Sequence, residues 1–86
     1  MQAFDHEGHL IQPGLLSPPM VCAAVADDRT RSTRFMLRDE ALDWLEAFLR
    51  DSDEELAGAN IAYDLVVAGA ERPRLLDLIF DAYQQG

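Results

Sequence analysis

A continuous apolar run from Met20 to Ala26 sets the strongest limit on the fold. A run of this length between turn signals is typical of a central strand that is buried on both faces of a sheet. The charged turn at 27–31 is short, so the weakly alternating residues 32–37 predict a second strand antiparallel to the first. We therefore expect the chain to be organised around a sheet.

Turn residues and helical periodicity predict the neighbouring elements. Residues 1–5 predict a short first strand, and residues 6–19 predict a loop or at most a frayed hairpin arm, because glycine and proline recur in them. Residues 39–50 predict a helix, since their apolar side chains fall on one stripe, with Asp39 as the expected N-cap.

The second half of the chain predicts one more strand and two helices. Residues 51–55 predict an acidic surface turn, and residues 58–62 predict a short strand that leads into a helix near Tyr63. After Pro73, residues 74–85 predict a last helix. The order strand, strand, strand, helix, strand, helix, helix is that of an α/β fold with a mixed sheet.

Length, cysteine content and hydropathy suggest a small cytoplasmic domain. The 86 residues fit one domain, 1–86, of modest stability. The single cysteine, Cys22, excludes an intramolecular disulfide and fits a reducing compartment. No apolar run approaches the roughly 20 residues that cross a bilayer, and the amino terminus lacks the features of a signal peptide. We expect no membrane partner.

The net charge of −9 argues against nucleic-acid binding through a basic surface. Phosphate contacts need lysine or arginine, and the chain has seven arginines and no lysine. An acidic protein can still engage DNA where divalent metal ions invert the local charge. Useful affinity would then need basic surface from additional polypeptide.

Two acidic groups that are remote in sequence carry the functional interpretation. Asp5 and Glu7 would share one face of a strand, with His6 on the other. Two carboxylates this close repel each other unless a proton or a metal ion lies between them. Asn60 and Asp64 follow more than fifty positions later, where a strand-to-helix turn could aim Asp64 back toward Asp5.

Both groups resemble motifs of one nuclease family. Phe4-Asp5-His6-Glu7 and Gly58-Ala59-Asn60-Ile61-Ala62-Tyr63-Asp64 resemble the first two motifs of the DEDD-type 3′→5′ exonuclease (proofreading) domains of bacteriophage and bacterial family-A DNA polymerases. Residues 10–14 and 18–22 are similar as well, so the resemblance covers nearly all of the chain. It implies a ribonuclease-H-like mixed sheet and a hydrolase of terminal phosphodiesters in single-stranded DNA.

The resemblance also implies a two-metal site of Mg²⁺ or Mn²⁺. By resemblance Asp5 would bridge both ions, Glu7 would bind the ion nearer the attacking water, and Asp64 would bind the other. Asn60 and Tyr63 would contact the substrate, the 3′ end of single-stranded DNA. Carboxylate oxygens suit these hard cations, and two ions about 3.5–4 Å apart can drive phosphodiester cleavage. The remainder of a DNA polymerase chain is the implied protein partner.

The chain departs from the family pattern in two places. The family needs a fourth aspartate in a later helix, preceded by Tyr or His, and none of the acids after Asp64 matches it in order; they are Glu71, Asp77 and Asp81. Ala59 stands where many relatives have histidine. We therefore expect the front part of an exonuclease domain, truncated before the last strand and helix. Whether this chain is active by itself is left open.

Other interpretations remain beside the nuclease. The chain could be an inactive ribonuclease-H-like module that acts through protein contacts. His6, Glu7 and His9 could form a transition-metal site, and an uncovered apolar face of the last helix could support a homo-oligomer. Cys22 is expected in the core. The nuclease interpretation would fail if the Asp64 carboxyl group lay far from those near the amino terminus or faced the interior.

Overall fold

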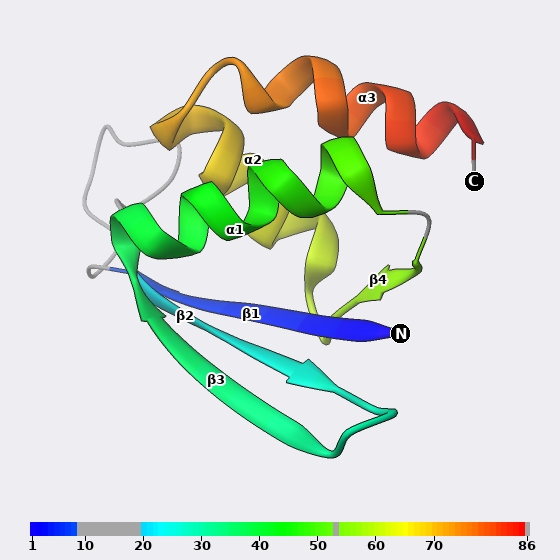
Figure 1. The fold of residues 1–86 in the computed structure, drawn as a ribbon. Coiled ribbons are helices and arrows are strands. Elements are labelled where there is room, and N and C mark those ends of the chain that lie inside the picture. Colours follow the sequence, from blue (N-terminus) through cyan, green and yellow to red (C-terminus); the bar gives the residue numbers. More distant parts are fainter. Residues whose placement is uncertain (9–19, 53, 86) are drawn as a thin grey trace.

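The computed structural model describes residues 1–8, 20–52 and 54–85, and these ranges contain four strands and three helices. In chain order they are β1 (Gln2–Gly8), β2 (Met20–Asp27), β3 (Ser32–Leu37), α1 (Arg38–Asp51), β4 (Leu56–Ala57), α2 (Ile61–Glu71) and α3 (Leu75–Gln85). The predicted α/β class and the predicted order of elements are confirmed (Figure 1).

The strands form one mixed sheet in the order β3-β2-β1-β4. β1 pairs antiparallel with β2 and parallel with β4, and β2 pairs antiparallel with β3. The short turn after β2 therefore makes the predicted hairpin, and α1 provides the crossover that the parallel pairing requires. β4 is so short that its register joins only Gln2 to Leu56 and Ala3 to Ala57.

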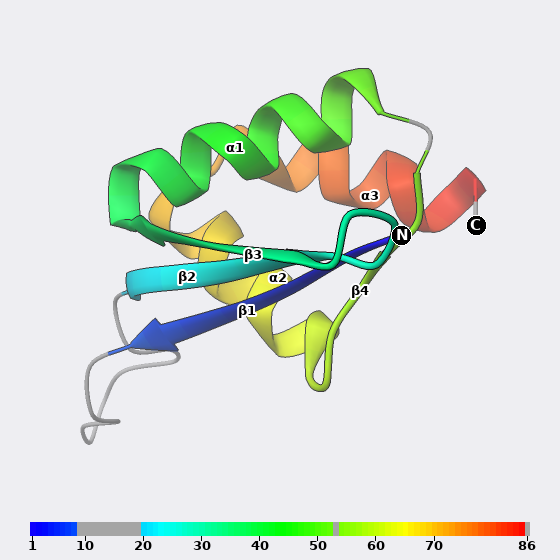
Figure 2. The same ribbon diagram turned by 60° about the horizontal axis from the view of Figure 1, so that its bottom comes forward.

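Two helices cover the same face of the sheet. The ring of Phe4 on β1 stacks on Trp44 of α1, with centroids 6.0 Å apart. His6, two residues further along β1 and thus on the same face, contacts Asp64 of α2. α3 packs against α1 and α2 (Figures 1 and 2).

The core lies between this face and the helices. Its buried apolar side chains are Phe4, Met20, Ala23, Val25, Met36, Ala41, Leu42, Leu45, Leu65, Val67, Ala68, Leu75 and Ile79. On the opposite face of the sheet Phe35 is 78% exposed and Leu37 is 76% exposed. The prediction that β2 is buried on both faces is wrong, because Ala24 and Ala26 are only partly buried and α1 and α2 lie together on the other side.

The strand boundaries differ from the predicted ones at both motifs. β1 continues to Gly8 where a loop was predicted from residue 6, because the long β2 offers it pairing partners as far as Met20. The remaining part of the predicted loop, 9–19, lies outside the described residues. β4 forms at Leu56–Ala57, and not at 58–62.

The helix boundaries shift by one or two residues. α2 begins at Ile61, earlier than the predicted start near Tyr63, and Asn60 becomes its N-cap residue. α1 begins at Arg38, so its N-cap is Leu37, and the expected cap Asp39 lies in the first turn instead. A carboxylate in that turn still interacts favourably with the helix dipole.

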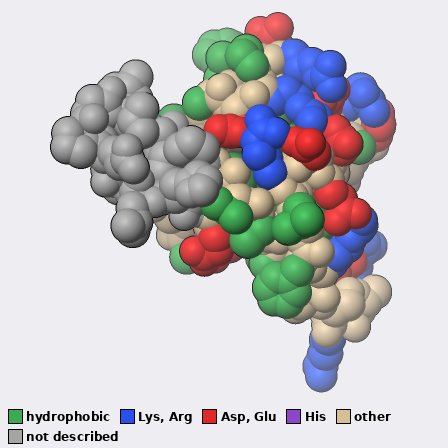
Figure 3. All heavy atoms as spheres, turned by 90° about the vertical axis from the view of Figure 1, so that its left-hand side faces the viewer, with side chains coloured by type: hydrophobic (Ala, Val, Ile, Leu, Met, Phe, Trp, Pro, Cys, Tyr) green, Lys and Arg blue, Asp and Glu red, His purple; other side chains and the backbone are tan. Residues whose placement is uncertain are grey.

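Ion pairs connect α1 to the segment between α2 and α3. Arg72 donates from Nη1 to Asp43 at 2.7 Å and to Glu46 at 3.0 Å, and Arg74 donates from Nε to Glu46 at 2.9 Å. Arg38, at the start of α1, is paired with Glu71 at the end of α2. Arginine and acidic side chains alternate over this end of the molecule (Figure 3).

None of the helices within the described residues has both the length and the apolar character needed to span a membrane. The longest, α1, has 14 residues and carries charged side chains at both ends. Its buried side chains, Ala41, Leu42 and Leu45, form a single stripe toward the sheet.

Candidate functional site

β1 separates the first acidic motif from the histidine within it. Asp5 and Glu7 are exposed, whereas His6 is 8% exposed and lies on the face that the helices cover. This alternation is the one expected for a strand. The register places Asp5 opposite Ala24 and Glu7 opposite Cys22 on β2, so both carboxylates stand over small side chains of the open face.

α2 brings Asp64 to His6 across 58 positions of sequence. His6 Nδ1 lies 2.5 Å from Asp64 Oδ1, and only 4% and 3% of the two side chains are exposed. The ring of Tyr63 lies beside the imidazole, with centroids 5.6 Å apart. A buried carboxylate and a buried imidazole are both costly alone, so each supplies the partner that the other needs.

Burial and hydrogen bonding act on the pKa of Asp64 in opposite directions. Burial raises the pKa of Asp64, hydrogen bonding from the side chain and backbone of His6 lowers it, and the charge of Asp5 raises it again. The net effect is a pKa above the ordinary value of an aspartate.

One oxygen of Asp64 is left without a partner. Oδ2 is buried and makes no hydrogen bond within the described part of the chain, whereas Oδ1 is held by His6. Buried carboxylate oxygens normally accept hydrogen bonds, take up a proton or bind a cation. The raised pKa of Asp64, caused mainly by burial, favours a proton on this carboxyl group.

The three predicted carboxylates do not gather into one cluster. Within the residues that the structure describes, no group of three or more His, Cys, Asp or Glu side chains is placed to hold a metal ion. Asp64 faces the interior and is 2% exposed, while Glu7 is exposed on the open face. The expected convergence on one edge is thus replaced by a pair, because His6 offers Asp64 a buried partner.

The two predicted substrate contacts have different surroundings. Asn60 is exposed at the N-cap of α2, where its carbonyl accepts a hydrogen bond from the Asp64 N–H at 3.0 Å. Its side chain makes no capping hydrogen bond, although asparagine commonly caps helices in this way. Tyr63 is half-buried against His6. Asn60 is therefore the more accessible of the two.

The alternative metal site built from His6, Glu7 and His9 is not formed by its described members. His6 and Glu7 point to opposite faces of β1, as their burial shows, and His9 lies outside the described residues. Cys22 is only half-buried on the open face, so its predicted place in the core is wrong.

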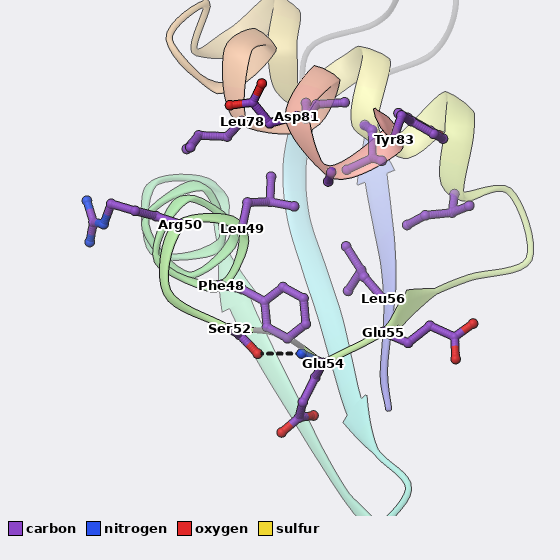
Figure 4. Close-up of a pocket in the computed structure, with 14 residues that line it drawn as sticks. Phe48, Leu49, Arg50, Ser52, Glu54, Glu55, Leu56, Leu78, Asp81 and Tyr83 are labelled. Carbon is purple, nitrogen blue, oxygen red and sulfur yellow. Dashed lines mark hydrogen bonds between the residues drawn. The ribbon is translucent and has the colours of Figure 1, made fainter. Parts of the chain in front are cut away.

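A groove of about 790 Å³ opens elsewhere, between the end of α1, β4 and the end of α3 (Figure 4). Its apolar lining includes Phe48, Leu56 and Leu78, and Glu54 and Asp81 add carboxylates. The backbone N–H of Glu54 donates to Ser52 Oγ at 3.1 Å beside it. The described lining residues include none of the five predicted site residues.

Sequence reasoning missed the pairing of His6 with Asp64. A signal was present, because Phe4 and His6 are separated by two positions and so share a face of the strand. A histidine that shares a face with a core phenylalanine needs a polar partner from a neighbouring element. Asp64 lies in the first turn of α2, which packs on this face of β1.

Comparison of the chain with models of protein families, with curated proteins and with solved structures finds no match. Function is therefore inferred from the residues and their arrangement, above all from the position of Asp5 and Glu7 on β1 and from the contact that joins Asp64 to the same strand.

Proposed function

We propose that the chain is the front part of a metal-dependent 3′→5′ exonuclease (proofreading) domain with a ribonuclease-H-like sheet. The observation that carries the proposal is that two remote motifs meet on β1: Asp5 belongs to the strand, and Asp64 contacts its neighbour His6. The parallel pairing of β1 with β4 and the crossover through α1 agree with such a sheet.

The donor types suit Mg²⁺ or Mn²⁺, but the described residues do not bring them together, because Asp64 faces the interior while Asp5 and Glu7 stand on the open face of the sheet; this burial counts against the proposal. Asp5 and Glu7 offer exposed carboxylates, and Asp64 offers the unpartnered Oδ2. These are hard oxygen ligands of the kind that both ions prefer. When bound, the ions would activate a water molecule and stabilise the leaving oxygen of a phosphodiester. Asn60, exposed at the start of α2, would position the strand terminus.

The charge distribution limits how this chain engages DNA. Six of the seven arginines form ion pairs with carboxylates of the chain; they are Arg29, Arg34, Arg38, Arg50, Arg72 and Arg74. Phosphate contacts would compete with these pairs. Binding of a single-stranded 3′ end would thus depend on the metal ions and on basic surface of the remaining polymerase.

A Mn²⁺ titration followed by calorimetry or NMR tests the metal site. The wild type should bind Mn²⁺, and Asp5→Ala should bind it much more weakly because it loses the bridging carboxylate. A matched control is Asp28→Ala, which removes an exposed carboxylate from the turn between β2 and β3. Equal responses of the wild type and Asp5→Ala would contradict the proposal.

A second candidate function is favoured by the burial of Asp64. Because His6 already satisfies Oδ1, the pair can serve as a structural contact in a non-catalytic module that acts through protein surfaces. Exposed apolar side chains on two sides of the molecule would suit such a role, including a homo-oligomer; they are Phe35, Leu37, Leu76, Phe80 and Tyr83. Metal-dependent cleavage of single-stranded DNA that Glu7→Gln abolishes would eliminate this candidate.

A further inference from the structure

The groove between the ends of α1 and α3 opens onto the hydrophobic core (Figure 4). The buried side chains of Leu65 and Ile79 form part of its lining, and both belong to the core cluster. Around them are apolar side chains that are only partly buried; they are Phe48, Leu49, Leu56, Ile61 and Leu78. Tyr83, which also lines the groove, is 59% exposed. The groove therefore exposes apolar surface that is continuous with the core.

Carboxylates border this apolar surface and are not matched by available cations. Glu54 already pairs with Arg29 and with the amino terminus. Glu55 and Asp81 are exposed, and neither makes an ion pair with a residue that the structure describes. Arg50, the one basic side chain among the described lining residues, is itself paired with a neighbouring aspartate. The groove thus combines an apolar lining with a negatively charged rim.

The charge of the rim distinguishes between possible occupants of the groove. Nucleic acid and anionic lipid surfaces would be repelled by the carboxylates. A second copy of the chain has a net charge of −9 as well, and six of its seven arginines are engaged in ion pairs. An occupant that has both apolar side chains and basic groups of its own complements the lining and the rim together.

We propose that the groove binds an amphipathic peptide segment of another protein, which places apolar side chains against Leu56 and Leu78 and lysine or arginine beside Glu55 and Asp81. The volume of about 790 Å³ is within the range of roughly 300–1,000 Å³ that is usual for ligand sites. An amphipathic helix that lies in an apolar groove is a common mode of peptide recognition. The inference does not depend on the metal site proposed above, because none of the residues described in the lining belongs to that site.

Three synthetic peptides with one helical pattern serve as probes. The first combines leucine with lysine, the second leucine with glutamate, and the third serine with lysine. In calorimetry, the wild type should bind the first peptide at least about tenfold more tightly than the other two, because each of these lacks one half of the required chemistry. Equally tight binding of the serine–lysine peptide would overturn the inference, since attraction to the net charge would then explain binding.

Substitutions in the groove have matched controls on the same helix. Tyr83→Ala should weaken binding of the leucine–lysine peptide about tenfold, whereas Phe80→Ala, which truncates a similarly exposed ring outside the groove, should not. Asp81→Asn should weaken binding about two- to fivefold, as expected for an exposed ion pair, while Asp77→Asn should leave it unchanged. Far-UV circular dichroism shows that the variants are folded. Equal losses within either pair of variants would overturn the inference.

NMR of the wild type locates the bound peptide. The leucine–lysine peptide should shift the methyl signals of Leu56 and Leu78, and shifts confined to Leu37 and Leu76 would overturn the inference because these side chains lie outside the groove. Sedimentation without peptide tests the other occupant. A dimer that Tyr83→Ala dissociates would show that a second copy fills the groove, which also overturns the inference. A failure to bind Mn²⁺ would contradict only the proposed exonuclease.

Discussion

Phe4 and Phe35 have the same side chain and lie in strands of one sheet, yet Phe4 is 1% exposed and Phe35 is 78% exposed. Phe4 faces the helices and stacks on Trp44. Phe35 lies on the opposite face, across from Ala24 of β2. Residue type alone therefore does not tell which face of this sheet is the core, and the arrangement of α1 and α2 decides it.

The largest effect is expected when Phe4 and Phe35 are each truncated. Phe4→Ala should lower the free energy of unfolding by about 3–5 kcal/mol, because it removes a buried ring and leaves a cavity. Phe35→Ala should change it by no more than about 0.5 kcal/mol, as is usual for an exposed site. Urea unfolding measures both, and similar losses for the two variants would show that the open face is covered in solution.

Two glycines extend the comparison from side chains to backbone. A Cβ at Gly58 would lie 2.5 Å from the carbonyl oxygen of Phe4, whereas a Cβ at Gly69 would meet the end of the Leu76 side chain. Gly58→Ala should therefore cost about 1–3 kcal/mol of stability through forced backbone movement. Gly69→Ala should be nearly neutral, because Leu76 can turn away and alanine gains about 1 kcal/mol in helix propensity.

Urea unfolding of both glycine variants tests this expectation. Far-UV circular dichroism serves as the control, since neither change should alter the helix content of the folded state. A Gly69→Ala variant that is less stable than Gly58→Ala would contradict the expectation. It would mean that the contact between α2 and α3 is more rigid than the edge between β1 and the segment after β4.

The smallest expected effect is on the pH dependence of stability, and it involves Glu46 of α1. Partial burial raises the pKa of Glu46, but Arg74 and Arg72 more than offset this, so the pKa lies below the ordinary value of 4.5. The ionised form thus stabilises the fold above that value, and this contribution is lost as the pH falls through the lower pKa of the folded state.

Glu46→Gln should consequently lose less stability between neutral pH and pH 3 than the wild type. The matched control is Asp81→Asn, which neutralises an exposed carboxylate on α3. Thermal unfolding over this pH range measures how steeply the stability of each variant falls with pH. If Glu46→Gln lost as much stability toward pH 3 as the wild type, the arginines of the segment after α2 would not hold this carboxylate in solution.

The sequence was sufficient for the order of the elements and for the alternation along β1. The apolar run of β2 and the helical stripe of α1 are local patterns, and local patterns predict local structure well. The burial of β2 on one face only was not predictable, because an apolar run does not reveal how many layers cover it.

The candidate site was predictable in its parts and not in its contacts. Asp5 and Glu7 lie on one face as expected, since strand geometry fixes this. The partner of Asp64 depends on where α2 begins and how it rotates against β1, which the motif spacing does not specify. His6, which stands between Asp5 and Glu7 in the sequence, became the partner of Asp64.

The brevity of β4 has a consequence for access to β1. Its ladder ends at Ala3, and Gly58 still lies close to the Phe4 carbonyl, so among the described residues β1 beyond Phe4 lacks a paired strand only on the edge that faces away from β2. Asp64 contacts His6 from the covered face, on the part of β1 beyond that ladder. A longer β4 would gain ladder hydrogen bonds with β1, but residues that now begin α2 would then have to lie in the strand.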